Sequence, residues 1–205
     1  MGITYKASDL VTAAMKLADL ENTSFISSTE NRMYINNAWE EIYQKAINIG
    51  EQYFLEEADL DIGENDLPED FYQLYDIRDI NNNPIKRWNK NCLKNERYYR
   101  IYKDKIYING KPKDVKMTYY PAPQALDITG EGDVDLPFPN NIYKMLLVYK
   151  LAEYYKIRQN GDVSGIEALM ENAWNVFYDT IERDDNENLV INDVVHDNHW
   201  FTYQN

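Results

Sequence analysis

The sequence predicts an α+β fold, in which a mainly helical bundle carries a small antiparallel β-meander and ends in an extended C-terminal arm. Apolar residues recur at helical spacing in four segments, two in the N-terminal part and two in the C-terminal part. Short runs rich in Tyr and Ile lie between these pairs and are separated by turn residues. A chain of 205 residues buries one sizeable core, so we expect one domain over residues 1–185 and an arm over 186–205.

Two helices are predicted in the N-terminal part. Ser8 is a candidate N-cap for a helix over residues 8–20, whose apolar residues form one stripe. The second helix is expected over residues 28–49. Ser27 and Glu30 have the spacing of a capping box there, in which each side chain accepts a hydrogen bond from the other residue's backbone. These local signals predict a helical start of the fold.

The middle of the chain reads as strands and turns. Residues 53–62 alternate in polarity and predict a strand, and the Gly-Glu-Asn-Asp stretch at 63–66 predicts a loop. Residues 67–71 place Pro at the first turn of an expected short helix. Three runs over about 97–120 predict the antiparallel meander, and Asn109-Gly110 is a strong hairpin signal between the last two runs.

Two further helices are predicted over residues 140–159 and 164–183, joined as a helical hairpin. Ser164 and Glu167 have the spacing of a second capping box. The stretch from Tyr149 to Ile157 carries more apolar surface than one partner helix covers. We therefore expect a contact between subunits at Tyr149, Tyr154, Tyr155 and Lys156.

The C-terminal arm is predicted to dock on a partner protein. Its acidic start around residues 184–187 cannot fold by burying apolar surface, whereas the residues that follow include large apolar side chains. Apolar anchors on a polar tether indicate a binding partner. The expected anchors are Leu189, Val190, Ile191, Trp200, Phe201 and Tyr203.

The composition argues against several classes of protein. The formal net charge of -14 repels phosphate, so a protein that wraps nucleic acid is not expected. The single cysteine, Cys92, rules out an internal disulfide and fits assembly in a reducing cytoplasm. The apolar stretch at residues 10–20 is too short to span a bilayer and contains two charges, so no membrane partner is expected.

We expect no catalytic residue, cofactor or metal. Neighbouring acids resemble the carboxylate pair of a glycosidase, but adjacent residues on a helix or strand face different ways. Such pairs are Glu40-Glu41, Glu56-Glu57 and Glu69-Asp70. His196 and His199 lie near two aspartates in the predicted arm, where solvated or interface histidines are a better interpretation than metal ligands.

The order of these elements resembles that of the head-to-tail adaptor proteins of short-tailed bacteriophages, the head-completion or tail tubular protein A-like group. The most specific pieces are the motif at residues 66–71, Tyr119-Tyr120-Pro121 and the helix entry at Leu136-Pro137. The abundance of Asn, Lys, Tyr and Ile, typical of AT-rich coding DNA, suggests a ring protein of a crAss-like phage. The resemblance covers about Ser8 to Arg183.

This resemblance implies a structural, non-enzymatic virion protein of the phage neck or tail, assembled in the host cytoplasm. Identical subunits, commonly a dodecamer, would close a ring through heterologous contacts. The implied partners are the portal protein, the next tail or ring protein, and double-stranded DNA that passes through the lumen without specific binding during genome ejection. Two alternatives are a virion-associated peptidoglycan hydrolase, which a zymogram would detect, and a stand-alone binding module, which would form no ring.

Overall fold

The computed structural model describes residues 3–20, 26–89, 92, 97–110, 114–126, 135–138 and 140–187. In this part of the chain the helices are α1 (Ala7–Leu17), α2 (Ser28–Asn48), α3 (Asn141–Arg158) and α4 (Ser164–Glu187). The strands are β1 (Ile3–Lys6), β2 (Glu56–Leu60), β3 (Gly63–Asp66), β4 (Phe71–Asp79), β5 (Lys86–Arg87), β6 (Tyr98–Tyr102), β7 (Lys105–Asn109), β8 (Val115–Pro121) and β9 (Asp135–Phe138).

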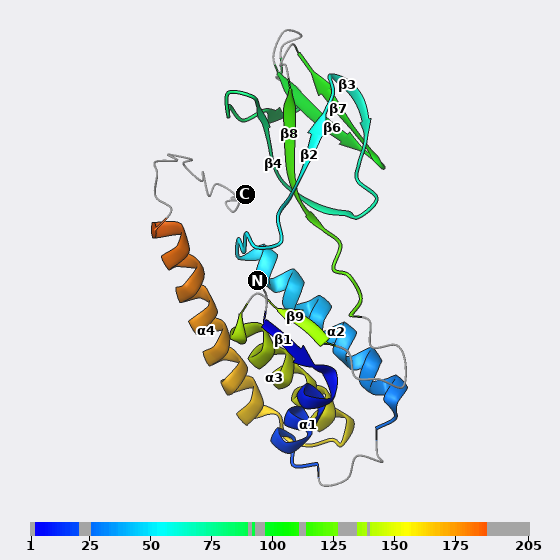
Figure 1. Cartoon of the computed structure of the whole chain (residues 1–205), viewed down its shortest axis with the longest axis vertical. Helices are drawn as coiled ribbons and strands as arrows, with labels where there is room; N and C mark the ends of the chain where they lie inside the picture. Colours follow the sequence, from blue (N-terminus) through cyan, green and yellow to red (C-terminus); the bar gives the residue numbers. More distant parts are fainter. Residues whose placement is uncertain are drawn as a thin grey trace, which may run out of the picture.

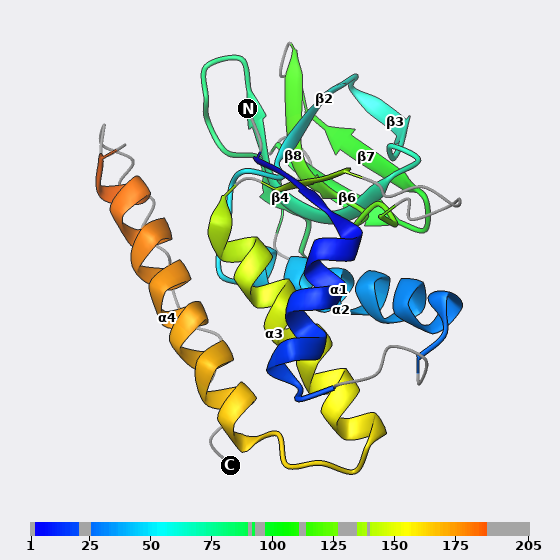
Figure 2. The same ribbon diagram turned by 60° about the horizontal axis from the view of Figure 1, so that its bottom comes forward.

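The elements form two parts, a helical body and a β-rich head (Figure 1). In the body, α3 contacts α1, α2 and α4, and the short strands β1 and β9 pair antiparallel beside the helices. α4 runs along one side of the body (Figure 2). The body core includes Leu10, Ile35, Trp39, Leu146, Leu151 and Phe177, all of which are buried.

Local capping signals explain the start of α2. The Ser27 hydroxyl accepts a hydrogen bond from the Glu30 backbone N–H at 3.2 Å, and the Glu30 carboxylate accepts one from the Ser27 backbone N–H at 3.0 Å. This is the capping box that the sequence predicts, and it is confirmed. The other two predicted caps are wrong. Lys6 precedes α1 without a side-chain cap, and Ser164 is the first residue of α4 while its backbone N–H donates to Asp162.

The head consists of two sheets around one apolar core. One sheet has the strand order β2-β8-β4 and is antiparallel, and the other has the order β3-β7-β6-β5. Side chains alternate along each strand, so one face of each sheet contributes to the shared core. The buried members are Leu60, Ile77, Ile85, Ile106, Ile108, Val115, Met117 and Tyr119.

The predicted meander is only partly present. Strands β6 and β7 pair as a hairpin across Lys103-Asp104, as expected. The third run, β8, instead leaves this sheet after Asn109-Gly110 and pairs with β2 and β4. Two further predictions are wrong. Residues 63–66 form strand β3 instead of a loop, and the expected short helix at 67–71 is a turn that leads into the nine-residue strand β4.

The α+β class is therefore correct. The prediction of a mainly helical bundle is wrong, because the strands β2 to β8 form two sheets in the described part of the chain. The predicted arm begins inside a helix, since α4 continues to Glu187. The remainder of the arm, from residue 188, lies outside the described residues. Among the helices that the structure describes, none has the length and apolarity needed to cross a bilayer.

Aromatic side chains connect the head to the body. The Tyr43 hydroxyl on α2 donates a hydrogen bond to the Pro121 carbonyl oxygen at 2.6 Å. Tyr120, although part of β8, is buried in the body core. The Tyr43 ring also lies 6.5 Å, between centroids, from that of Tyr72 on β4. These contacts hold the two parts in one orientation.

Candidate functional site

α3 carries the four residues predicted at a contact between subunits. Tyr155 is fully buried, and its hydroxyl donates a hydrogen bond to Asn31 Oδ1 at 2.7 Å. Its ring packs edge-on against Tyr34 on α2, with the centroids 6.1 Å apart. A side chain enclosed in its own subunit has no surface to offer a neighbour, so Tyr155 is a core residue.

The other three predicted contact residues, Tyr149, Tyr154 and Lys156, are partly buried and keep some surface. The Tyr154 hydroxyl donates to Glu41 Oε1 at 2.6 Å, and Lys156 Nζ lies 3.1 Å from Asp19 Oδ2. These bonds connect α3 to α2 and to Asp19, in the turn after α1. Their role between subunits stays a prediction.

Lys150 is the centre of an ionic network between α2 and α3. Its Nζ atom lies 2.8 Å from Glu41 Oε2 and 2.8 Å from Glu153 Oε2, and its side chain is 17% exposed. Burial opposes the charged form of Lys150, but hydrogen bonds to the two carboxylates outweigh it and raise the pKa of this amine. Lys150 therefore neutralises Glu41 and Glu153 of the body.

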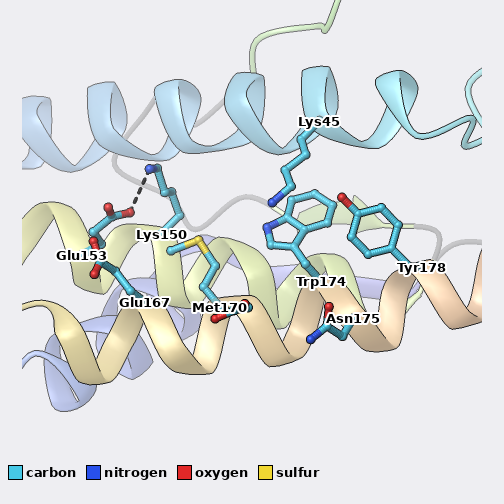
Figure 3. A pocket seen from close by; sticks show the side chains of 9 residues that line it. Lys45, Lys150, Glu153, Glu167, Met170, Trp174, Asn175 and Tyr178 are labelled. Carbon is cyan, nitrogen blue, oxygen red and sulfur yellow. Dashed lines mark ion pairs between the residues drawn. The ribbon is translucent and has the colours of Figure 1, made fainter.

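A groove of about 380 Å³ opens between α2 and α4, with α3 at its base (Figure 3). Lys45 Nζ lies 4.3 Å from the centroid of the Trp174 ring, which is a cation–π contact. Burial, and then the charge of Lys150, lower the pKa of Lys45. Met170 and Tyr178 extend the apolar wall on α4. The remaining lining is charged or polar and consists of Lys150, Glu153, Glu167, Glu171 and Asn175. The groove thus combines an apolar wall with charges of both signs, which suits a protein segment.

The head exposes a second hollow, of about 300 Å³, on the outer face of the sheet β3-β7-β6-β5. Trp88, Tyr98, Arg100 and Tyr107 line it. Arg100 on β6 is directly opposite Tyr107 on β7 in the sheet register. Three aromatic side chains and a guanidinium at one surface are typical of protein-binding hot spots.

The neighbouring acids Glu56 and Glu57 of the head lie on β2. Glu56 and Glu57 are opposite Tyr119 and Thr118 in the sheet, so their side chains lie on opposite faces. Glu57 Oε2 lies 2.7 Å from Lys116 Nζ in an ion pair. The Tyr119 hydroxyl lies 3.3 Å from Glu56 Oε2, a contact within the sheet. These acids connect strands of the fold.

Several predicted site residues lie outside the described part of the chain. They are the docking anchors Leu189, Val190, Ile191, Trp200, Phe201 and Tyr203, together with His196 and His199. Within the described residues, no group of three or more His, Cys, Asp or Glu side chains is arranged to hold a metal ion.

Sequence reasoning missed the two hollows. Lys45 and Trp174 are far apart in the chain, and only the packing of α2 and α4 around α3 brings them together. Trp88 and Arg100 meet because β5 pairs with β6 in parallel, a pairing that no local turn signal indicates. The exposed Tyr residues of the meander were a usable signal for the second hollow, but cross-strand packing explains them equally well.

Comparison with known proteins gives one positive result. The family model described as SU10 adaptor protein matches residues 5–190, a range that includes both the body and the head. No curated protein sequence matches the chain significantly.

Proposed function

We propose a function for this chain from its family, since it belongs to the SU10 adaptor protein family. In this proposal it is a structural protein of the phage neck, and twelve copies form a ring between the portal and the tail. Members of an adaptor family are virion components that contact other head or tail proteins. In this proposal the ring assembles in the host cytoplasm, lines the DNA channel and has no enzymatic activity. The family match over both parts of the molecule is the observation that carries the proposal.

The distribution of charge supports a role beside passing DNA. Outside residues 56–121 the chain has 22 acidic and 9 basic residues, whereas residues 56–121 have 13 acidic and 12 basic residues. Nearly all of the net charge of -14 therefore belongs to the body and the tail segment. An acidic wall disfavours the residence of DNA phosphates, so duplex DNA slides past it without binding.

Contacts between subunits are proposed on the helical body. Tyr149, Tyr154 and Lys156 lie on α3, and the groove of Lys45 and Trp174 lies between α2 and α4. In a closed ring each interface joins two different surfaces of the same chain, so one surface must complement the other. The apolar wall of Met170, Trp174 and Tyr178 fits this requirement because it accepts an apolar surface of the neighbouring copy.

The segment from residue 186 onward is proposed as the arm that docks on the portal or on a neighbouring adaptor. Trp200 and Phe201 would supply most of the binding energy, since aromatic anchors dominate most interfaces. Ordering such an arm costs conformational entropy, so a few strong anchors are needed to offset it.

Electron microscopy of the intact virion tests the proposal, together with mass photometry of the purified protein at micromolar concentration. We expect closed rings in solution and density for the chain between the portal and the tail. A protein that stays monomeric at every concentration and in the presence of its portal would contradict the ring. Clearing of peptidoglycan in a zymogram, lost on substitution of one carboxylate, would instead support a hydrolase.

A further inference from the structure

The head separates its charges along the chain and across one sheet. Residues 56–79 contain ten acidic and one basic residue, whereas residues 86–103 contain seven basic and one acidic residue. In the sheet β3-β7-β6-β5, the acidic strand β3 forms one edge and the basic strand β5 forms the other. Three strand spacings separate these edges, about 14 Å. At the β3 edge Lys105 pairs with Glu64 and Asp66, so the acid of this region without an ion-pair partner among the described residues is Glu69, in the turn that follows β3.

The hollow of Trp88 and Arg100 extends over the outer face of this sheet, from the end of β5 across β6 to Tyr107 on β7. Trp88 is 43% exposed, and its backbone N–H donates to the Tyr99 carbonyl oxygen at 2.7 Å, which fixes it beside β6. Tyr107, also 43% exposed, completes the aromatic wall. Arg100 is exposed and makes no ion pair with any residue that the structure describes. The hollow thus combines exposed aromatic surface with a cation that has no ion-pair partner among the described residues.

The acidic edge ends in the turn at residues 66–70, which connects β3 to β4. The Leu67 backbone N–H donates to the Asp104 carbonyl oxygen at 2.9 Å, so the turn is held against the β6–β7 hairpin. Pro68 is partly exposed, and Glu69 beside it is exposed. Lys105 neutralises Glu64 on this edge, whereas Glu69 has no ion-pair partner among the described residues. The turn therefore presents an apolar ring flanked by a free carboxylate.

We propose that the turn at residues 66–70 of one copy docks in the Trp88–Arg100 hollow of the next copy. In this contact the Pro68 ring packs on the aromatic wall and the Glu69 carboxylate pairs with the Arg100 guanidinium. Within one head the turn is held against the β6–β7 hairpin by the Leu67 N–H, and the described residues show no ion pair between Glu69 and Arg100, so we assign the contact to two copies. The contact is heterologous, so its repetition generates a ring, and this inference rests on the proposed function. A nucleic acid strand is a poorer occupant, since the chain as a whole repels phosphate.

Engineered disulfides test the contact directly in the full chain. In a Cys92→Ser background, Glu69→Cys and Arg100→Cys are introduced together, and each is also introduced alone. Mild oxidation of the double variant is expected to give a ladder of covalent oligomers on a denaturing gel. Neither single variant is expected to give bands beyond a dimer, because only the two cysteines together connect every subunit to the next.

A charge swap provides the second measurement. Arg100→Glu and Glu69→Arg are each expected to lower the apparent association constant of the ring about tenfold or more, which corresponds to the loss of one interfacial charge pair. The double variant Arg100→Glu/Glu69→Arg is expected to recover it, because the pair is restored with reversed signs. Lys16→Glu, an exposed position on the body, makes the same charge change as Arg100→Glu and is expected to leave assembly unchanged.

The outcomes separate this contact from the proposed function. If rings form without the covalent ladder and tolerate Arg100→Glu, the proposed contact is wrong but the proposed ring is not affected. Absence of rings from the wild-type protein would overturn both. If Arg100→Glu leaves rings intact but abolishes retention of a short DNA duplex in a gel-shift assay, the hollow contacts nucleic acid and the proposed docking is overturned.

Discussion

Replacing Tyr155 by Phe and by Ala separates a core residue from an interface residue. Tyr155→Phe keeps the buried ring and removes only the hydroxyl that donates to Asn31 at 2.7 Å. The net contribution of such a hydrogen bond is about 1 kcal/mol. Tyr155→Ala removes the whole ring from a fully buried position, and truncation of a buried aromatic side chain costs about 3–5 kcal/mol. We therefore expect these two losses in the free energy of unfolding.

Urea denaturation of the isolated subunit, followed by circular dichroism at low protein concentration, measures both losses. Since a domain is stable by only about 5–15 kcal/mol, Tyr155→Ala is expected to shift the midpoint strongly. Tyr149→Ala, at a partly buried position of the same helix, is the control and is expected to lose less. If Tyr155→Ala lowers the free energy of unfolding by less than about 1 kcal/mol and the variant fails to assemble, Tyr155 is an interface residue and the core assignment is wrong.

Three further predictions concern pH, the head and the tail segment. Burial, and then the charge of Glu56, raise the pKa of Tyr43 to about 12. The neutral form of Tyr43 therefore stabilises the fold fully below about pH 10, and this contribution is lost as the pH rises through about 12. A titration of tyrosinate absorbance in which all tyrosines ionise near about pH 10 would contradict this. Asp79→Asn is expected to speed amide hydrogen exchange at Asn81 and Asn83, whose backbone N–H groups donate to the Asp79 carboxylate at 2.9 Å; unchanged exchange would contradict this. Truncation after Glu187 is expected to leave the melting temperature nearly unchanged but to prevent entry into particles, whereas a large drop would mean that this segment covers its own subunit.

The helices were predictable because their signals are local. The capping box of Ser27 and Glu30 depends on residues three apart, and apolar spacing along one helix does not depend on the rest of the fold. The same kind of signal failed at residues 67–71, where a proline followed by acids resembles a helix start. Phe71 instead begins β4 and pairs with Pro121, and the Leu67 backbone N–H donates to the Asp104 carbonyl oxygen, so contacts with distant residues outweigh that local preference.

The topology of the head was not predictable because it depends on contacts between distant residues. Asn109-Gly110 has the composition of a two-residue hairpin, yet β8 pairs with β2 and β4, which precede it by tens of residues. The buried position of Tyr155 was equally hidden, since an apolar helix face does not reveal whether its own chain or a neighbour covers it. Both errors underestimated how much of the apolar surface this chain covers by itself.

The division of charge between head and body constrains how copies of this chain meet. Two bodies that approach each other bring many carboxylates together, and the central cation Lys150 is already paired with Glu41 and Glu153 inside its own subunit. Lys45 lies over the Trp174 ring and shares its groove with Glu153, Glu167 and Glu171 of the same subunit. The head is nearly neutral, and Glu69 and Arg100 have no ion-pair partner among the described residues, so two heads attract each other when these two groups face each other. The electrostatic contribution to ring closure is therefore expected from the heads, while apolar contacts must supply the association of the bodies.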